Sequence, residues 1–515
     1  MQCAARAIAV STVVILLAAG PLTDSWSATA NAIPVESGQT GPACVANAPW
    51  LRYVVLFKRG TEPDAATAAI AAACGSTTIY YPEIAVAVAG TSVSTFADVI
   101  GRGRAYSAQA EGLPGIEPQP GPQTPDPQSP APRSLGPSIR IRTGRAVLGG
   151  FTGAAPTGDP AVQGQQWNME MIRAGEANAV TSGSPDVLVG VLDSGIDAEH
   201  PELSAAVDRS ASADCTTGRP DTGAESWRPT GPHGTHVAGL IAAADDGKGI
   251  TGVAPGVRLA SVKVVDPGGF IYPEYAVCGF MWAAKRGMRI TNNSYFVDPW
   301  LFTCSNQPGQ AVVHEAVRRA VAYATASGVL SVAAIGNENA DLADPGVDTH
   351  SPNNSPGPHR RPVDNSCDVL PAELPGVLTV AAVGAQGAKS SYSSYGAGVV
   401  DIAAPGGDIR QRVGGADSGC VLSTVPGGGY GRMCGTSMAA PHVTGVAALV
   451  ASKHPDATPA ELSRLVTESA APVDCPDRYD PNSDGRPDAT CERVGERGNS
   501  FTGAGIVDAM AAVSQ

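Results

Sequence analysis

Gly435-Thr436-Ser437-Met438-Ala439-Ala440-Pro441-His442 places a serine where a glycine-rich turn, residues 425–431, leads into a helix that runs to about residue 452. The first turn of a helix carries unpaired N–H groups and a partial positive charge. These groups stabilise the oxyanion that forms when a serine hydroxyl attacks a carbonyl carbon. A serine that only caps the helix is the plainer interpretation, but Pro441 and the small residues before it fit a plain cap less well. Ser437 is therefore a candidate nucleophile.

An aspartate ends a buried strand in Val189-Gly190-Val191-Leu192-Asp193-Ser194-Gly195-Ile196-Asp197. The apolar run at residues 186–192 is typical of a strand that is covered on both faces. Parallel sheets bring functional groups together at the carboxyl ends of their strands. Taken alone, this segment fits an ordinary turn aspartate better, and Asp193 becomes a candidate catalytic residue only together with the other segments.

A histidine flanked by two glycines precedes an apolar helix in Gly231-Pro232-His233-Gly234-Thr235-His236-Val237-Ala238-Gly239. The glycines keep bulky side chains away from the imidazole of His233, a candidate general base. His233 and His236 could instead bind a metal, but no carboxylate lies between them at the position that a zinc peptidase uses. We therefore expect His236 to be structural. His442 is too near Ser437 in sequence to act as its base, and we expect it to be packed.

Predicted strands and helices alternate from residue 163 onward. The strands fall at residues 186–192, 259–265, 289–292, 329–334 and 377–383, and helices fall at 275–286 and 311–327. This alternation predicts an α/β fold with a mainly parallel sheet and helices on both of its faces.

The three segments together resemble the subtilisin-like serine peptidases, in the chain order Asp193, His233, Ser437 and in the residues around each. The resemblance extends from about residue 165 to 510. It implies that Ser437 is the nucleophile, that His233 is the general base and then acid, and that Asp193 orients the imidazole. This chemistry requires no cofactor.

The resemblance also implies an oxyanion element and substrate-binding segments. Ala333-Ala334-Ile335-Gly336-Asn337 resembles the element that supplies an asparagine donor, Asn337, and Gly336 is expected to contact substrate. The segment that pairs with an extended substrate corresponds to Asn293-Ser294-Tyr295-Phe296. Bulky aromatic residues stand where the family usually has leucine and glycine, so we expect a cleft that is narrower or more selective than usual.

The expected activity is hydrolysis of proteins or peptides by a serine endopeptidase. Two alternatives stay open at this point. A dedicated processing protease with a narrow partner would agree with the unusual aromatic residues Tyr295 and Phe296. A non-catalytic secreted binding protein on a protease scaffold agrees less well, because Asn337 and the three candidate catalytic residues are all present.

The first 32 residues are typical of an export signal. They contain a positive charge at Arg6, an apolar stretch at residues 8–19, and the small-residue cleavage pattern Ala30-Asn31-Ala32. The apolar stretch is shorter than the roughly 20 residues that an ordinary membrane-spanning helix needs. We expect a secreted, extracellular protein without a membrane partner.

Three further regions follow the predicted signal. Residues 33–110 predict a small α+β unit, and residues 163–515 predict the peptidase domain. Residues 111–162 between them predict a linker rich in Pro, Gly and Gln, whose exposed backbone is a natural site for proteolytic processing. The N-terminal unit is either a lasting domain or a removable propeptide. The family resemblance favours a propeptide that assists folding and blocks the cleft as an intramolecular inhibitor.

Charge and cysteine content limit the partners and the compartment. With 34 basic and 48 acidic residues, the net charge of −14 argues against a nucleic-acid partner, and we expect a monomer. The cysteines suggest disulfides in an exported protein. The pairs to test first are Cys420–Cys434 and Cys475–Cys491, and Cys44–Cys74 is a third candidate.

One further segment, Asp480-Pro481-Asn482-Ser483-Asp484-Gly485-Arg486-Pro487-Asp488, resembles the beginning of a calcium-binding loop. Its candidate ligands are Asp480, Asn482, Asp484 and Asp488. The twelfth position holds Cys491 instead of the usual glutamate. A structural calcium ion and a solvated, disulfide-closed loop therefore remain equally good interpretations.

Overall fold

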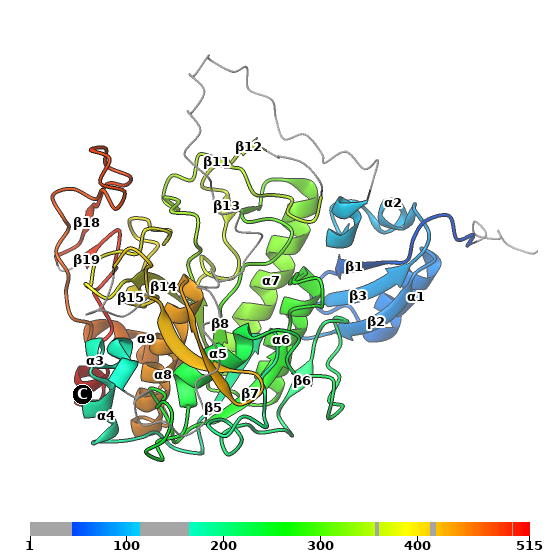
Figure 1. The fold of residues 1–515 in the computed structure, drawn as a ribbon. Coiled ribbons are helices and arrows are strands. Elements are labelled where there is room, and N and C mark those ends of the chain that lie inside the picture. The colour runs from blue at the N-terminus through cyan, green and yellow to red at the C-terminus, as the bar shows by residue number, and fades with distance from the viewer. Residues whose placement is uncertain (1–43, 114–163, 356–359, 412–418, 497) are drawn as a thin grey trace, which may run out of the picture. The chain divides into compact units, whose positions relative to one another are not determined.

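A seven-stranded parallel sheet forms the centre of the computed structural model, which describes residues 44–113, 164–355, 360–411, 419–496 and 498–515 (Figure 1). The strands lie in the order β15 (Ile402–Pro405), β14 (Val377–Val383), β10 (Leu330–Ala334), β8 (Ile290–Asn293), β5 (Leu188–Asp193), β7 (Arg258–Lys263) and β6 (Ala213–Asp214). The predicted signal at residues 1–32 and most of the predicted linker at 111–162 lie outside the described residues.

Helices cover both faces of this sheet. One face packs against α6 (Pro273–Lys285) and α7 (Pro308–Ala326), and the other against α5 (His233–Ala242), α8 (Thr436–Lys453) and α9 (Pro459–Glu468). Side chains of β5 alternate between the two cores. Leu188 and Leu192 join the core of α6 and α7, whereas Val189 and Val191 join that of α5 and α8. A strand buried on both faces explains why its sequence is a continuous apolar run, and the predicted α/β fold is confirmed.

Short elements complete this part of the chain. They are α3 (Trp167–Met171), α4 (Ala174–Asn178), α10 (Ala509–Val513), and the strand pairs β9 (Thr303–Cys304) with β13 (Cys367–Asp368), β11 (Val347–Asp348) with β12 (Arg361–Pro362), β16 (Val421–Val425) with β17 (Gly429–Met433), and β18 (Arg493–Val494) with β19 (Gly498–Asn499). The β16–β17 hairpin leads directly into α8.

Disulfides join all ten cysteines of the described residues. The three predicted pairs, Cys44–Cys74, Cys420–Cys434 and Cys475–Cys491, are present. Two further pairs, Cys215–Cys278 and Cys304–Cys367, each connect residues that are 63 positions apart. Cys420–Cys434 closes the base of the β16–β17 hairpin and so supports the turn before Ser437.

Residues 44–113 form a separate small sheet with its own core. Its four antiparallel strands lie in the order β2 (Ser76–Tyr81), β3 (Val86–Thr91), β1 (Leu51–Leu56) and β4 (Ala105–Tyr106). The helices α1 (Pro63–Ala72) and α2 (Phe96–Ile100) bury Ile70 and Phe96 against one face of this sheet. A short 3₁₀ turn, η1 (Ala108–Gly112), follows β4. We call residues 44–113 the N-terminal domain.

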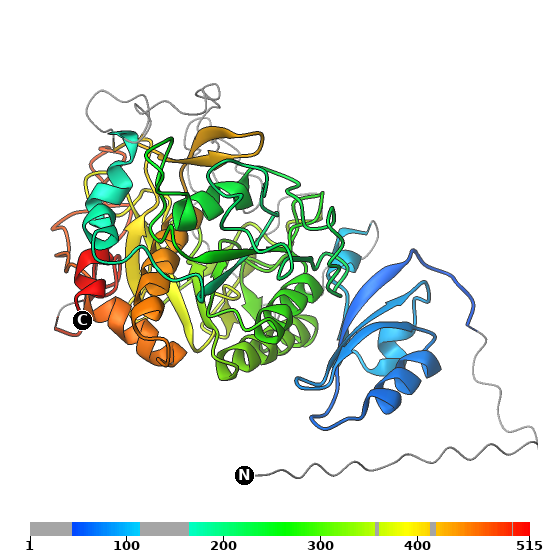
Figure 2. The ribbon, with the colours of Figure 1, turned by 90° about the horizontal axis from the view of Figure 1, so that it is seen from below.

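The N-terminal domain packs beside α6 and α7 (Figure 2). Arg52 donates a hydrogen bond of 2.7 Å to the Tyr275 hydroxyl and lies over the Tyr275 ring. Its Nε atom is 3.4 Å from the buried Glu274 carboxylate, close enough for an ion pair although these two atoms share no hydrogen bond. Arg319 of α7 donates to the backbone oxygens of Phe57 and Ile84 at 3.0 and 3.1 Å. In both contacts an arginine side chain of one domain binds buried residues of the other.

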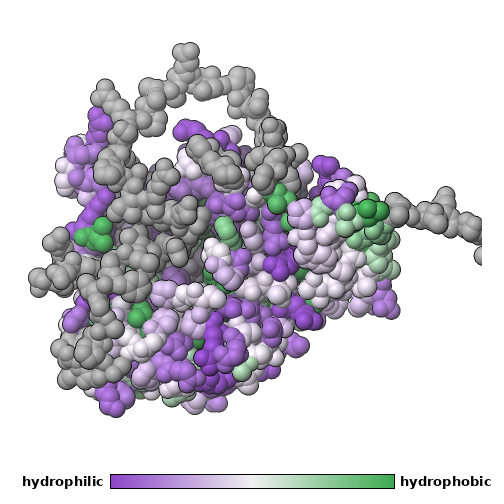
Figure 3. Space-filling view, turned by 45° about the vertical axis from the view of Figure 1, so that its right-hand side comes forward, coloured by the Kyte–Doolittle hydropathy of each residue, from purple (hydrophilic) through white to green (hydrophobic). Residues whose placement is uncertain are grey.

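The described surface in Figure 3 is largely hydrophilic, and its hydrophobic residues lie in small separate patches. The exposed large hydrophobic residues of the described chain are scattered: Val45, Trp50, Val99, Val180, Val347 and Ile409. No helix within the described ranges is both long and apolar enough to cross a membrane.

Candidate active site

Asp193 and His233 form a hydrogen-bonded pair. Asp193 is the last residue of β5 and is 2 % exposed, and His233 is the first residue of α5. The His233 Nδ1 atom lies 2.8 and 2.9 Å from the two Asp193 carboxylate oxygens. A side chain at Gly234 would meet the Gly195 carbonyl oxygen at 2.4 Å, so glycine at position 234 lets α5 begin this close to β5. This contact explains the glycine that follows the histidine in the sequence.

The other ring nitrogen of His233, Nε2, is buried and makes no hydrogen bond to any described residue. A neutral imidazole that donates through Nδ1 has an unshared electron pair on Nε2. Burial opposes protonation of the ring, but the charge of Asp193 and its hydrogen bond outweigh that effect and raise the pKa of His233. The pair can therefore accept a proton at Nε2 and hold the resulting charge.

Ser437 lies in the first turn of α8, which packs against α5 on the same face of the sheet. Its hydroxyl donates to the Ser294 carbonyl oxygen at 3.1 Å, and the Ser294 hydroxyl donates to the Ser437 carbonyl oxygen at 2.9 Å. In this resting arrangement the Ser437 hydroxyl points to Ser294, so it must turn to give its proton to a base. Hydrogen bonds of this kind often tighten only when substrate is bound.

Asn337 lies beside the start of α8. Its Oδ1 atom accepts two hydrogen bonds of 2.9 Å from Thr436, one from the backbone nitrogen and one from the hydroxyl. Because two donors meet the oxygen, the Nδ2 group must point the other way, which fixes the orientation of the amide. Gly336 has φ of 115°, a conformation that side chains disfavour. The sequence-predicted oxyanion donor is thus next to the sequence-predicted nucleophile.

The other predicted substrate-binding residues fall into two groups. Gly336, Ser294 and Tyr295 line a small cavity next to Ser437. The Asn293 side chain is fully buried, and its amide donates to the Thr291 and Val332 carbonyl oxygens. The Asn293 side chain therefore joins strands within the sheet and cannot reach a substrate, which leaves only its backbone for that role.

Two histidines near the candidate site are structural in their contacts. His236 Nε2 lies 3.2 and 3.1 Å from the carbonyl oxygens of Val421 and Gly431, and burial with the charge of His233 lowers its pKa to about 3. His442 Nδ1 lies 2.7 Å from the Met438 oxygen, and burial lowers its pKa to about 4. Both rings stay neutral and packed, in agreement with the expectation from their sequence positions.

Sequence reasoning missed two residues of the small cavity, Glu338 and Val369. Glu338 follows Asn337 directly, and its Oε2 accepts a 2.7 Å hydrogen bond from the Asn337 backbone nitrogen. The position of Glu338 next to a predicted donor was a signal that could have identified it. Val369 lies in a segment far from every recognisable motif, and nothing in the sequence brings it to the site.

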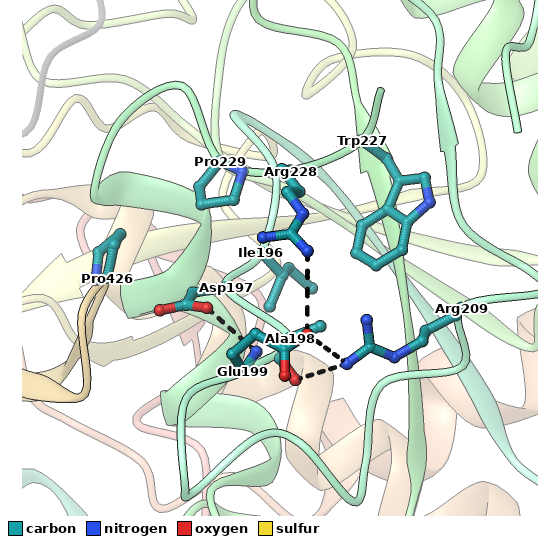
Figure 4. Close-up of a pocket in the computed structure, with 9 residues that line it drawn as sticks. All are labelled: Ile196, Asp197, Ala198, Glu199, Arg209, Trp227, Arg228, Pro229 and Pro426. Carbon is teal, nitrogen blue, oxygen red and sulfur yellow. Dashed lines mark hydrogen bonds and ion pairs between the residues drawn. The ribbon is translucent and has the colours of Figure 1, made fainter. Parts of the chain in front are cut away.

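A larger cavity of about 270 Å3 lies near the segments that follow Asp193 and precede His233 (Figure 4). Two charged side chains on its wall bind each other, since Arg209 donates to the Glu199 carboxylate at 2.8 Å. The Asp197 carboxylate accepts a hydrogen bond of 3.0 Å from the Glu199 backbone nitrogen. None of the three candidate catalytic residues lines this cavity.

Hydrogen bonds within the predicted calcium loop engage several of its candidate ligands. Both Asp480 oxygens accept hydrogen bonds from the loop backbone, at Asp484 and Gly485. The Asn482 amide nitrogen, and not its oxygen, faces Asp488. Among the described residues, no group of three or more His, Cys, Asp or Glu side chains is placed to hold a metal ion. The Asp480 oxygens thus accept hydrogen bonds from within the loop.

Comparison with known proteins places these residues in a wider context. The sequence model of the Subtilase family matches residues 184–498. Fervidolysin from Fervidobacterium pennivorans is 31 % identical over 319 residues, which are 59 % of this chain and 40 % of fervidolysin. Subtilisin E from Bacillus subtilis (strain 168) is 32 % identical over 308 residues, which are 60 % of this chain and 66 % of subtilisin E. The matched regions thus span less than two thirds of either relative.

Solved structures have the same fold. A protease from Pseudoalteromonas arctica has a TM-score of 0.51 at 28 % identity, over 70 % of this chain and 99 % of that one. The epidermin leader peptide processing serine protease from Staphylococcus aureus has a TM-score of 0.63 at 18 % identity, over 90 % of this chain and 98 % of that one.

Proposed function

The chain belongs to the subtilase family, and we propose that it is a secreted serine endopeptidase that hydrolyses peptide bonds through an acyl-enzyme. The observation that carries the proposal is the hydrogen-bonded pair of Asp193 and His233 at one edge of the sheet, with Ser437 and Asn337 adjoining at the start of α8. The proposed substrates are proteins or peptides, and no metal or cofactor enters the reaction.

The proposed first step is attack by Ser437. The Ser437 hydroxyl turns from Ser294 to His233, whose Nε2 takes the proton while Oγ bonds to the substrate carbonyl carbon. Asp193 holds the Nδ1 proton and stabilises the imidazolium. The Asn337 amide and the backbone N–H of Ser437 stabilise the oxyanion. His233 then returns the proton to the leaving amine, and a water molecule hydrolyses the acyl-enzyme by the same steps.

We propose that the N-terminal domain is a propeptide that inhibits the site until it is removed. Its last described residues contact the peptidase part of the chain, because Trp300 donates a 2.7 Å hydrogen bond to the Tyr106 hydroxyl. Asn354 donates to the Ala108 carbonyl oxygen at 2.9 Å. Ala108 also belongs to the core formed by α6 and α7. These contacts hold the end of the N-terminal domain against the rest of the chain, and self-cleavage after it would release the domain.

The test compares wild type with Ser437→Ala, and with Ser463→Ala on α9 as a matched control. Wild type and the control should react with a fluorophosphonate probe, digest casein, and begin between about residues 111 and 165 when secreted. Ser437→Ala should do none of these and should keep the N-terminal domain. Casein digestion by Ser437→Ala would disprove the proposed nucleophile. An identical N-terminus in wild type and Ser437→Ala would disprove self-processing.

A dedicated processing protease is the second candidate function. The small cavity beside Ser437 favours it, and a protein of similar fold is a leader peptide processing serine protease. Slow digestion of casein combined with rapid cleavage of a few members of a peptide library would favour this candidate. A non-catalytic binding protein would show no reaction with the fluorophosphonate probe. The monomeric state is a further proposal, which light scattering of the secreted protein tests.

A further inference from the structure

The cavity beside Ser437 has room for very little. Its volume is about 20 Å3, less than a tenth of the 270 Å3 of the cavity in Figure 4. A space this small favours a methyl or hydroxymethyl group over a longer side chain. Its lining includes Tyr295, Phe296, Glu338 and Val369, together with Asn337 and Ser437.

The position of this cavity determines which part of a substrate meets it. The carbonyl group attacked by Ser437 must lie between the Ser437 hydroxyl and the Asn337 amide. The side chain of that same substrate residue branches from the atom next to the carbonyl carbon. It therefore meets the cavity that Ser437 and Asn337 share.

The two apolar walls are held in place by the backbone. Val369 is 1 % exposed, is stiff because it is β-branched, and donates a 2.6 Å hydrogen bond from its nitrogen to Glu373. Phe296 is 8 % exposed, and the nitrogen of the next residue, Val297, donates to the Leu370 oxygen at 2.9 Å. This bond joins the segment of Phe296 to the segment of Val369. The walls cannot move apart unless it breaks.

The acidic wall is also held in place. Glu338 Oε2 accepts the Asn337 backbone N–H at 2.7 Å, and a side chain at Gly336 would approach the same oxygen at 2.8 Å. The carboxylate therefore folds back over Gly336 instead of extending toward a basic side chain. Burial raises the pKa of Glu338.

From this geometry we infer that the enzyme cleaves after small residues, namely glycine, alanine or serine, and that Phe296 and Val369 set this specificity. The inference rests on the proposed function. It goes beyond it by naming the class of residue on the acyl side of the cleaved bond.

The experiment uses the secreted wild-type protein, with active sites counted by fluorophosphonate titration. Internally quenched peptides differ only in the acyl-side residue: Gly, Ala, Ser, Leu, Phe or Lys. We expect kcat/KM for the best small residue to exceed that for Leu, Phe and Lys at least about tenfold, since even one misplaced methylene group changes discrimination by about 10- to 200-fold.

Variants then test the walls. Val369→Gly and Phe296→Ala should raise the ratio of kcat/KM for the Leu and Phe peptides to kcat/KM for the Ala peptide about tenfold or more. Val377→Ala is the matched control, because it shortens a buried valine of β14 in the same core without lining the cavity. Val369→Ala replaces Val369→Gly if the glycine variant unfolds at a lower temperature than the control.

The outcomes separate the two proposals. Preference of wild type for small residues, with a gain for Leu and Phe in the wall variants alone, supports the inference. Efficient cleavage after Leu, Phe or Lys by wild type overturns it while leaving the endopeptidase intact. Failure to react with the probe and to cut any peptide overturns the proposed function, and the inference with it.

Discussion

Thr436 donates two hydrogen bonds to one atom, Oδ1 of Asn337, from its backbone nitrogen and from its hydroxyl. The residue next to the proposed nucleophile thereby fixes the orientation of the proposed oxyanion donor. An amide with its oxygen held in this way presents its nitrogen without reorganisation during the reaction, and such preorganised donors stabilise developing charge most effectively.

Removal of one of these bonds should slow the reaction. We expect Thr436→Val to lower kcat about tenfold with little change in KM, because the donor acts on the transition state. Asn337→Ala should lower kcat about 10²- to 10³-fold, the range for the loss of one oxyanion donor. Thr436→Ser keeps the hydroxyl and should behave like wild type. A loss in Thr436→Ser with none in Thr436→Val would show that the methyl group matters and the hydrogen bond does not.

The pH dependence of activity should reveal His233. Its ring accepts a proton only when neutral, and the charge of Asp193 helps to raise its pKa above the ordinary 6.5 despite burial. The kcat/KM of the free enzyme should therefore rise with pH through a value above 6.5. Asp193→Asn should move this rise to lower pH and reduce kcat by about 10⁴-fold. A pH–rate profile of both proteins checks this, and an unchanged midpoint in the variant would contradict it.

Stability should depend on pH through Glu373, a buried carboxyl group whose Oε2 accepts the Val369 backbone N–H. Burial raises its pKa to about 8 from the ordinary 4.5, against the effect of that hydrogen bond. Between these values the folded protein binds the extra proton, so the free energy of unfolding should fall as pH rises through this window, by at most about 1.4 kcal/mol per pH unit.

Glu373→Gln removes this titration but can still accept the Val369 hydrogen bond. Urea unfolding at pH 4 and at pH 9 should show a smaller loss of stability with pH for this variant than for wild type. Glu468→Gln, a change to an exposed pair with Arg464, is the control and should follow wild type. Parallel curves for all three proteins would rule out a contribution from Glu373.

Docking of the N-terminal domain should depend on Arg52. Its removal leaves the buried Glu274 without its ion pair and the Tyr275 hydroxyl without its donor, a loss of about 2 kcal/mol or more. In the Ser437→Ala background, which should retain the domain, Arg52→Ala should make α6 exchange its amide hydrogens faster. Arg59→Ala, an exposed change in the same domain, should not. Identical exchange in the two variants would contradict the role of Arg52.

The residues that could be predicted from the sequence are those in contiguous motifs. Asp193 ends an apolar run and Ser437 begins a helix, so each carries its own local signal. Val369 contributes to the site only because β13 pairs with β9 and the segment after β13 bonds to the segment after β8. That return is a property of the fold and leaves no local pattern. Asn293 shows what a motif position leaves open, since its side chain is buried within the sheet and only its backbone could meet a substrate.

The disulfides divide in the same way. Cys420–Cys434 and Cys475–Cys491 close short loops of 14 and 16 residues, and proximity in sequence predicted both. Cys215–Cys278 and Cys304–Cys367 connect different elements across 63 residues. The eight cysteines that follow residue 163 permit 105 pairings. Only the packing of α6 and the β9–β13 pair selects these two disulfides.

The distribution of the candidate site along the chain has a consequence for timing. Asp193 and His233 adjoin on neighbouring elements, but Ser437 belongs to α8, which follows both of them in the chain. Chains are synthesised from the N-terminus, and the parallel sheet that brings these segments together depends on distant contacts that form slowly. A growing chain therefore holds no complete candidate site until α8 has docked. Until then the proposed peptidase activity cannot act on the growing chain itself. By then the N-terminal domain has long been available to fold.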